Sequence, residues 1–183
     1  NMIEILMQDF RLLAHERDIT FEFQHAEEHV MMWCDAEKIG VVLNNLLNNA
    51  FKFTADGGRI TVVLSQDHEA KCCLIKVEDD GVGIPHSQLE TIFERFSQAD
   101  DRISTESVYA GTGIGLSLSR EYITMHGGKI WAQNIANGSG VEFNVELPID
   151  KAHFNHAEVE IYFDDNMEER PFVNTVATVD ISP

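Results

Sequence analysis

The stretch of residues 36–53 is the part of the sequence that most restricts the fold. Its apolar residues recur at the three- and four-residue spacing of a helix with one buried face. Asp35 stands at the position of a helix N-cap, and Lys38 follows it in the first turn. We therefore expect one long helix that packs on a core through the following residues: Ile39, Val42, Leu43, Leu46 and Ala50.

This predicted helix contains a concentration of asparagine. Four of the six residues 44–49 are asparagine, and each costs about half a kcal/mol relative to alanine in a helix. Asn45, Asn49 and Lys52 share one face, at the edge of the apolar one. An amide oxygen can bind Mg²⁺ and a lysine can bind a phosphate, so we interpret this stripe as functional. Asn44 and Asn48 are interpreted as ordinary solvated positions.

Two glycine-rich segments add to this pattern. Asp79 precedes Gly81 and Gly83 at the end of a predicted strand, where a backbone without side chains can approach a flat ligand. A second segment, residues 111–116, leads directly into a predicted helix, whose first N–H groups favour a phosphate. Each segment alone could be a tight turn. Together with the asparagine helix, they indicate a site for a magnesium nucleotide.

Several other classes of function are excluded by the sequence. Leu116 stands where the dinucleotide fingerprint requires glycine, and no Gly-Lys-Ser/Thr of a P-loop follows. C-x-x-C, H-E-x-x-H and G-x-S-x-G motifs are absent from the sequence. The 31 acidic residues outnumber the 13 basic ones, giving a net charge of −18. This charge argues against binding to nucleic acid or to an anionic membrane.

The order of predicted elements favours a two-layer α/β sandwich, because strands and helices only partly alternate. Helices are predicted at residues 3–17, 36–53, 86–96 and 114–126, and strands at 19–23, 29–33, 59–65, 71–77, 129–133 and 141–147. Residues 97–112 have little periodicity and are predicted to be a mobile loop.

Over residues 19–148 the sequence resembles the ATP-binding catalytic domain of sensor histidine kinases. The asparagine box of that family matches residues 45–52, and its two glycine boxes match residues 79–83 and 111–115. Its phenylalanine box matches residues 93–96, so four boxes stand in the family's order. The resemblance implies an α+β fold: a mixed, mostly antiparallel sheet covered on one face by three helices, with a mobile ATP lid.

The resemblance also implies roles for single residues. Asn45, Asn49 and Lys52 would be the catalytic set, with Asn49 as the Mg²⁺ ligand. Asp79 would accept a hydrogen bond from the adenine amine, and the lid would be residues 97–110. The remaining ATP contacts would come from the glycine and phenylalanine boxes and the lid: Gly81, Gly83, Phe93, Phe96, Arg102, Gly111, Thr112, Gly113, Ile114, Gly115 and Leu116.

One residue separates a kinase from a hydrolytic ATPase. The ATPases of the superfamily place a glutamate at the position of Asn45, where it activates water. An amide cannot take a proton at neutral pH, so Asn45 favours transfer to an imidazole. The alternatives that remain are a degenerate nucleotide-binding docking module and, less favoured, an ATPase.

The domain organisation follows from the same resemblance. Residues 1–18 would be the end of a linker helix from a dimerising hairpin that bears the phosphoacceptor histidine, and residues 19–150 the ATP-binding domain. Residues 151–183 hold two basic and seven acidic residues, and we expect a linker or tail that leads to a receiver domain. His15 is interpreted as a surface residue of the linker helix. The parent would be a hybrid sensor anchored in a membrane, with this part cytoplasmic, bound to no nucleic acid or membrane, and monomeric when isolated.

Overall fold

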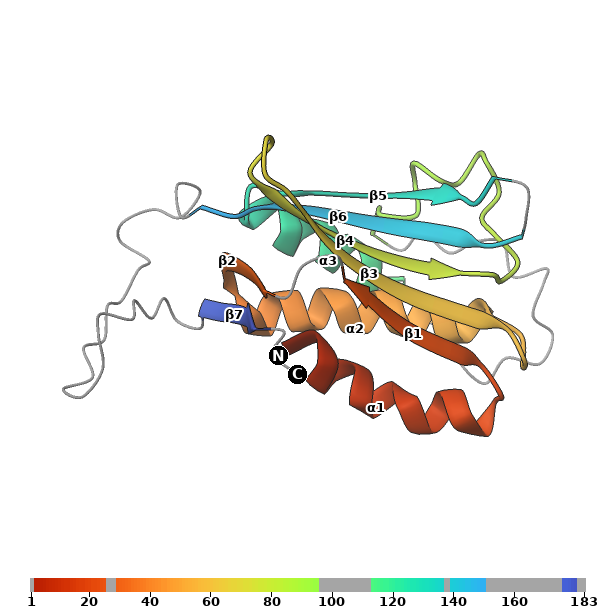
Figure 1. Ribbon diagram of the computed structural model, residues 1–183. Helices are drawn as coiled ribbons and strands as arrows, with labels where there is room; N and C mark the ends of the chain where they lie inside the picture. Colours follow the sequence, from red (N-terminus) through yellow and green to blue (C-terminus); the bar gives the residue numbers. More distant parts are fainter. Residues whose placement is uncertain (1, 26–28, 96–112, 137–138, 151–175, 181–183) are drawn as a thin grey trace.

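The computed structural model describes residues 2–25, 29–95, 113–136, 139–150 and 176–180. Within them, three helices lie against one face of a five-stranded sheet (Figure 1). The elements in chain order are α1 (Met2–Glu16), β1 (Thr20–His25), β2 (His29–Asp35), α2 (Ala36–Phe53), β3 (Arg59–Asp67), β4 (Cys72–Asp79), α3 (Gly115–Met125), β5 (Lys129–Asn134), β6 (Val141–Pro148) and β7 (Val176–Asp180). The expected two-layer α+β architecture is confirmed.

The sheet is mixed and mostly antiparallel, as expected. Its strand order is β1-β3-β4-β6-β5, in which β1 and β3 are parallel and the other neighbours antiparallel. The strands β4 and β6 at its centre pair from Cys72 opposite Pro148 to Asp79 opposite Val141. The end of β4 that carries Asp79 therefore lies beside the start of β6.

The alternation of side chains along β4 places an acid on the core face. Cys73, Ile75, Val77 and Asp79 are all buried, at two-residue spacing, while the residues between them are half-buried. Since successive side chains of a strand point to opposite faces, Asp79 points toward the helices. The apolar face of α2 covers this row and closes the core, as the spacing of its apolar residues predicted.

The prediction of a helix at residues 86–96 is wrong. Residues 86–95 form turns, and three of the four backbone hydrogen bonds between Pro85 and Glu94 span three residues, not four. Ile92 and Phe93 are both buried within these turns. Phe93 packs edge-on against Phe143 of β6, with ring centroids 6.3 Å apart.

The last described segment of the chain forms a strand. β7, within residues 151–183, pairs antiparallel with β2, from His29 opposite Asp180 to Asp35 opposite Val176. β2 also contacts the chain just after β6, because Trp33 N–H donates to the Ile149 carbonyl at 3.2 Å. Within the described part of the chain, no helix is long and apolar enough to cross a membrane.

Candidate nucleotide-binding site

The site is built around the buried carboxyl group of Asp79. This residue is only 4% exposed, and its Oδ1 accepts a hydrogen bond from Gly81 N–H at 2.9 Å. Burial raises the pKa of Asp79 to about 6, although hydrogen bonds from the backbone of Gly81 and Val141 oppose the rise. A buried carboxylate that keeps acceptor capacity can bind an amino group of a ligand.

Glycines allow three backbone segments to meet around Asp79. A Cβ atom at Gly81 would lie 2.4 Å from the Phe53 carbonyl oxygen and 2.8 Å from Asp79 Oδ1. A Cβ atom at Gly140 would lie 2.0 Å from the Asp79 carbonyl oxygen. Gly83 has a positive φ of 76°, a conformation that favours glycine. The end of α2, the loop after β4 and the turn before β6 can therefore pack this closely only without side chains.

The asparagine helix contacts the second glycine segment directly. Asn45 Nδ2 donates to the Gly115 carbonyl at 3.0 Å and to Ser119 Oγ at 3.2 Å. Gly113 has a positive φ of 67°, and Ile114, the N-cap of α3, makes no side-chain cap. Among the described residues, no side chain caps the first N–H groups of α3, which favours a phosphate there.

The other members of the stripe lie along the same helix. Asn49 is half-buried, and its side chain makes no hydrogen bond to another described residue. Lys52 is exposed, and its Nζ lies 5.1 Å from the centre of the Phe53 ring. Asn48 Nδ2 donates to Asn44 Oδ1 at 2.7 Å on the exposed side of α2, as expected for solvated positions.

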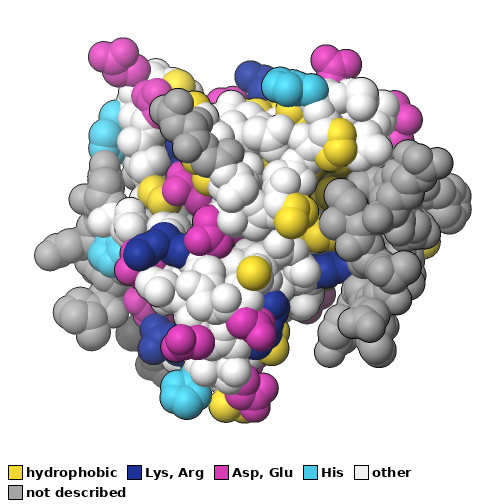
Figure 2. Space-filling view, turned by 90° about the vertical axis from the view of Figure 1, so that its right-hand side faces the viewer, with side chains coloured by type: hydrophobic (Ala, Val, Ile, Leu, Met, Phe, Trp, Pro, Cys, Tyr) yellow, Lys and Arg dark blue, Asp and Glu magenta, His cyan; other side chains and the backbone are white. Residues whose placement is uncertain are grey.

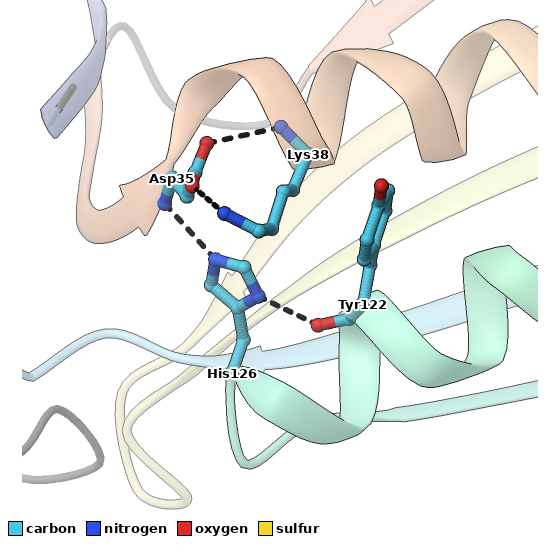
Figure 3. A network of polar contacts seen from close by, with 4 residues as sticks. All are labelled: Asp35, Lys38, Tyr122 and His126. Atoms are coloured by element: carbon cyan, nitrogen blue, oxygen red, sulfur yellow. Dashed lines mark hydrogen bonds and ion pairs between the residues drawn. The ribbon is translucent and has the colours of Figure 1, made fainter. Parts of the chain in front are cut away.

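A polar network joins the start of α2 to the end of α3 (Figure 3). Asp35 caps α2 by accepting from Lys38 N–H at 3.0 Å, and its carboxylate also pairs with Lys38 Nζ. Asp35 N–H donates to Nε2 of the buried His126 at 2.9 Å. Nε2 must therefore be unprotonated, so Nδ1 carries the proton and donates to the Tyr122 carbonyl at 2.7 Å. The two helices of the site are thus held together at the end remote from Asp79.

Replacing His126 by alanine should destabilise the domain by about 2–4 kcal/mol, because it leaves Asp35 N–H unpaired and opens a cavity. Urea unfolding measures this loss. His86→Ala is the matched control, since His86 is exposed and should change stability by less than ~0.5 kcal/mol. Equal unfolding midpoints for the two variants would contradict the structural role of His126.

The comparisons with known proteins agree with this geometry. A family model described as "Histidine kinase-, DNA gyrase B-, and HSP90-like ATPase" matches residues 34–151. This chain belongs to that family. Hybrid signal transduction histidine kinase D of Dictyostelium discoideum is 35% identical over 170 residues, and sensor histidine kinase WalK of Bacillus subtilis is 33% identical over 136. The matches cover 91% and 74% of this chain, which spans only 11% and 22% of the two relatives.

Solved structures of the same family share the fold. The nucleotide-free catalytic domain of histidine kinase ThkA is 32% identical, with a TM-score of 0.70 over 81% of this chain and 90% of that one. ThkA in complex with the response regulator protein TrrA is 29% identical, with a TM-score of 0.68 over 81% of this chain and 40% of that one.

Some of the predicted site residues of this family member lie outside the described residues. These are the lid at residues 97–110 and four ATP contacts: Phe96, Arg102, Gly111 and Thr112. The structure brings Asn45 beside the N-terminal turn of α3, with Gly115 and Leu116, and Asp79 beside Gly81. Phe93 is buried and packs against Phe143, and its predicted contact with ATP stays a prediction.

Three residues of the site were not found by sequence reasoning. Asn134, at the end of β5, holds the first glycine loop: its Oδ1 accepts from Ile84 N–H at 2.8 Å and its Nδ2 donates to the Ile84 carbonyl at 2.6 Å. Ser119 is fully buried behind Asn45, and Arg17 binds the end of α2. Each acts on a segment far away in the sequence, so no local motif marks it.

The described residues fit the magnesium nucleotide that this family implies. Asp79 and the close approach at Gly81 suit the amino edge of adenine, and the uncapped start of α3 suits phosphates. Mg²⁺ takes most of its ligands from water and phosphate, so the single amide oxygen of Asn49 is compatible with it. Figure 2 shows the end of the molecule where α2 ends, on which acidic and basic side chains are interspersed with apolar ones.

Proposed function

We propose that this chain is the ATP-binding catalytic domain of a sensor histidine kinase. It would bind Mg²⁺-ATP and support transfer of the γ-phosphoryl group to a histidine on a helical hairpin outside this chain. The observation that carries this proposal is that residue 45 is an asparagine whose side chain is hydrogen-bonded to α3. Both contacts of its amide N–H₂ are to α3, and an amide has no proton-accepting group for activating water.

The residues of the chain would act mainly by positioning and electrostatics, which is what phosphoryl transfer requires. Asp79 binds and orients the adenine amine. Asn49 supplies one oxygen ligand to Mg²⁺, and the ammonium group of Lys52 balances phosphate charge. Bound Mg²⁺-ATP supplies the activated phosphoryl group. Asn45 holds the start of α3 in place, so that its N–H groups face the phosphates.

The partners follow from the same proposal. ThkA was solved with a response regulator, and one of the relatives is named a hybrid kinase. We propose that a receiver domain accepts the phosphoryl group from the histidine, and that residues 151–183 lead toward it. Because ATP is the donor, we place this domain on the cytoplasmic side of a membrane-anchored sensor.

Transfer in trans tests the proposed function. A histidine-bearing hairpin of the sensor-kinase type, mixed with this chain and γ-labelled ATP, should acquire acid-labile, base-stable label. Steady-state phosphate release by the chain alone should stay near the uncatalysed background. Labelling must be lost when the hairpin histidine is replaced by glutamine.

Other outcomes of this experiment would contradict the proposal. ATP binding in calorimetry without any transfer would favour a docking module. Rapid release of phosphate without the hairpin would favour a hydrolytic ATPase.

A further inference from the structure

Arg17 binds the last turn of α2 from outside the segment matched by the family model. It follows α1 directly, whereas the match begins at residue 34. Its Nη2 donates to the Thr54 carbonyl at 2.7 Å, and its Nη1 donates to the Phe51 carbonyl. Its Nε donates to Asp56 Oδ1 at 2.8 Å, and its carbonyl accepts from Gly57 N–H at 3.0 Å.

These contacts satisfy groups that a helix leaves unpaired. The last carbonyl groups of an α-helix have no partner within the helix, and a cation near them is favourable. Arg17 reaches the two carbonyls from separate nitrogens of one rigid planar fork, whereas a lysine would have to reach both from a single ammonium nitrogen on a flexible stem. The ion pair with Asp56 matters less, because the Asp56 side chain is 75% exposed.

The turn that Arg17 holds leads directly to Asp79. Thr54 is the C-cap of α2, and the Phe53 carbonyl just before it lies against Gly81. Gly81 in turn donates its N–H to Asp79. A shift of the Phe53 carbonyl is therefore transmitted to the loop that orients the carboxyl group, since no side chain separates them.

Aromatic packing fixes α1 against the same turn. Phe10 of α1 stacks on Phe51, with ring centroids 5.2 Å apart and planes 22° apart, and Phe21 of β1 meets the same ring edge-on at 5.2 Å. The helix that precedes Arg17 is thus anchored at the end of α2.

We propose that Arg17 is a positioning residue of the nucleotide site. It acts through the last turn of α2, on Lys52 in that turn and on Asp79 through Phe53 and Gly81. This proposal rests on the proposed function, because it assigns Arg17 to ATP binding. It extends the nucleotide site to α1 and Arg17, which precede the segment matched by the family model.

Calorimetric titration of the whole chain with ATP and with ADP, in the presence of Mg²⁺, tests the proposal. Arg17→Ala should weaken binding of both nucleotides roughly tenfold, the value of about one charge-assisted hydrogen bond. Arg17→Lys should fall between Arg17→Ala and wild type. Asp56→Asn removes only the negative charge of the exposed partner, and Arg11→Ala removes an exposed arginine of α1, so both variants should bind like wild type.

A second readout separates positioning from general loss of stability. The amide resonances of Gly81 and Lys52 should shift in Arg17→Ala at a temperature where thermal unfolding shows the variant fully folded. If Arg17→Ala does not fold, Arg17→Lys carries the same test. Wild-type affinity together with unshifted Gly81 resonances in a folded Arg17 variant would overturn the role of Arg17 and leave the proposed function intact. Failure of wild type itself to bind nucleotide would overturn both.

Discussion

Asp79→Asn should lose ATP binding by roughly a hundredfold or more while the domain stays folded. The buried carboxylate is the acceptor that we propose for the adenine amine, and it has one hydrogen bond from Gly81 N–H already in place. An asparagine there presents an N–H₂ group that cannot accept. The same group can donate to a 6-oxo purine, so inosine triphosphate should lose less affinity than ATP.

The same residue should make nucleotide affinity depend on pH. A pKa of about 6 means that much of Asp79 is protonated at pH 5.5, and burial is the main cause. A donor from the ligand favours the charged form, so binding below pH 6 should release a proton. Affinity for ATP should rise as the pH increases from 5 to 7 and then level off.

The stability of the free domain should change in the opposite direction. Between pH about 4 and 6 the folded chain holds a proton on Asp79 that the unfolded chain has lost, so stability falls as the pH rises through this window. Asparagine does not titrate. Above pH 7, Asp79→Asn has no buried charge and should therefore be more stable than wild type. The gain should be about 1–2 kcal/mol, because the amide oxygen replaces only part of the hydrogen bonding that the carboxylate accepts from the backbone.

Two measurements check these expectations. Calorimetry in buffers of different ionisation enthalpy gives affinity and proton release, and urea unfolding at pH 4.5 and 7.5 gives stability. Asp80→Asn is the matched control: Asp80 is the exposed neighbour, and an asparagine keeps the Oδ1 acceptor for Arg59 N–H. Wild-type ATP affinity in Asp79→Asn, or an equal loss in both variants, would contradict the assignment.

The fold could be predicted where the pattern is local. The apolar spacing of α2 and its Asp35 cap are both visible within residues 35–53, and the structure has them where they were expected. The strand alternation that ends at Asp79 is also local, and it explains why an acid points into the core. Here the local spacing of apolar residues and the capping residue are enough to predict both the helix or strand and which of its faces is buried.

The parts that could not be predicted depend on distant segments. Ser119 and Asn45 are 74 residues apart in the sequence, and Asn134 and Ile84 are 50 residues apart. These pairs form only because α3 packs on α2 and β5 ends beside the first glycine loop. The turns at residues 86–95 also depend on a distant segment, because Phe93 packs against Phe143 of β6. Tertiary packing overrides local propensity at such positions.

Asn45→Asp should cause the second large loss, because it replaces a hydrogen-bond donor by an acceptor without changing the shape of the side chain. Asn45 Nδ2 lies 3.0 Å from the Gly115 carbonyl oxygen, and Ser119 Oγ already donates to that carbonyl at 2.8 Å. An aspartate would place an acceptor against an acceptor in a part-buried position. We expect the domain to lose about 2–3 kcal/mol of stability.

The effect on phosphoryl transfer should be larger than the effect on binding. The start of α3 would move away from α2, and its N–H groups would no longer face the phosphates where charge develops. The rate of transfer to a histidine hairpin in a single turnover should fall roughly a hundredfold. ADP affinity should fall much less, since Asp79 and the first glycine loop are untouched.

A neighbouring asparagine provides the control for charge. Asn48→Asp adds the same negative charge three residues later, on the exposed side of α2, where the Asn48 side chain donates a hydrogen bond to Asn44. It should keep stability within ~0.5 kcal/mol and transfer near the wild-type rate. If Asn45→Asp were no slower than Asn48→Asp, the hydrogen bonds from Asn45 to α3 would not be what holds the phosphate-binding turn. If instead both variants slowed equally, added charge near the phosphates, and not the lost donor, would be the cause.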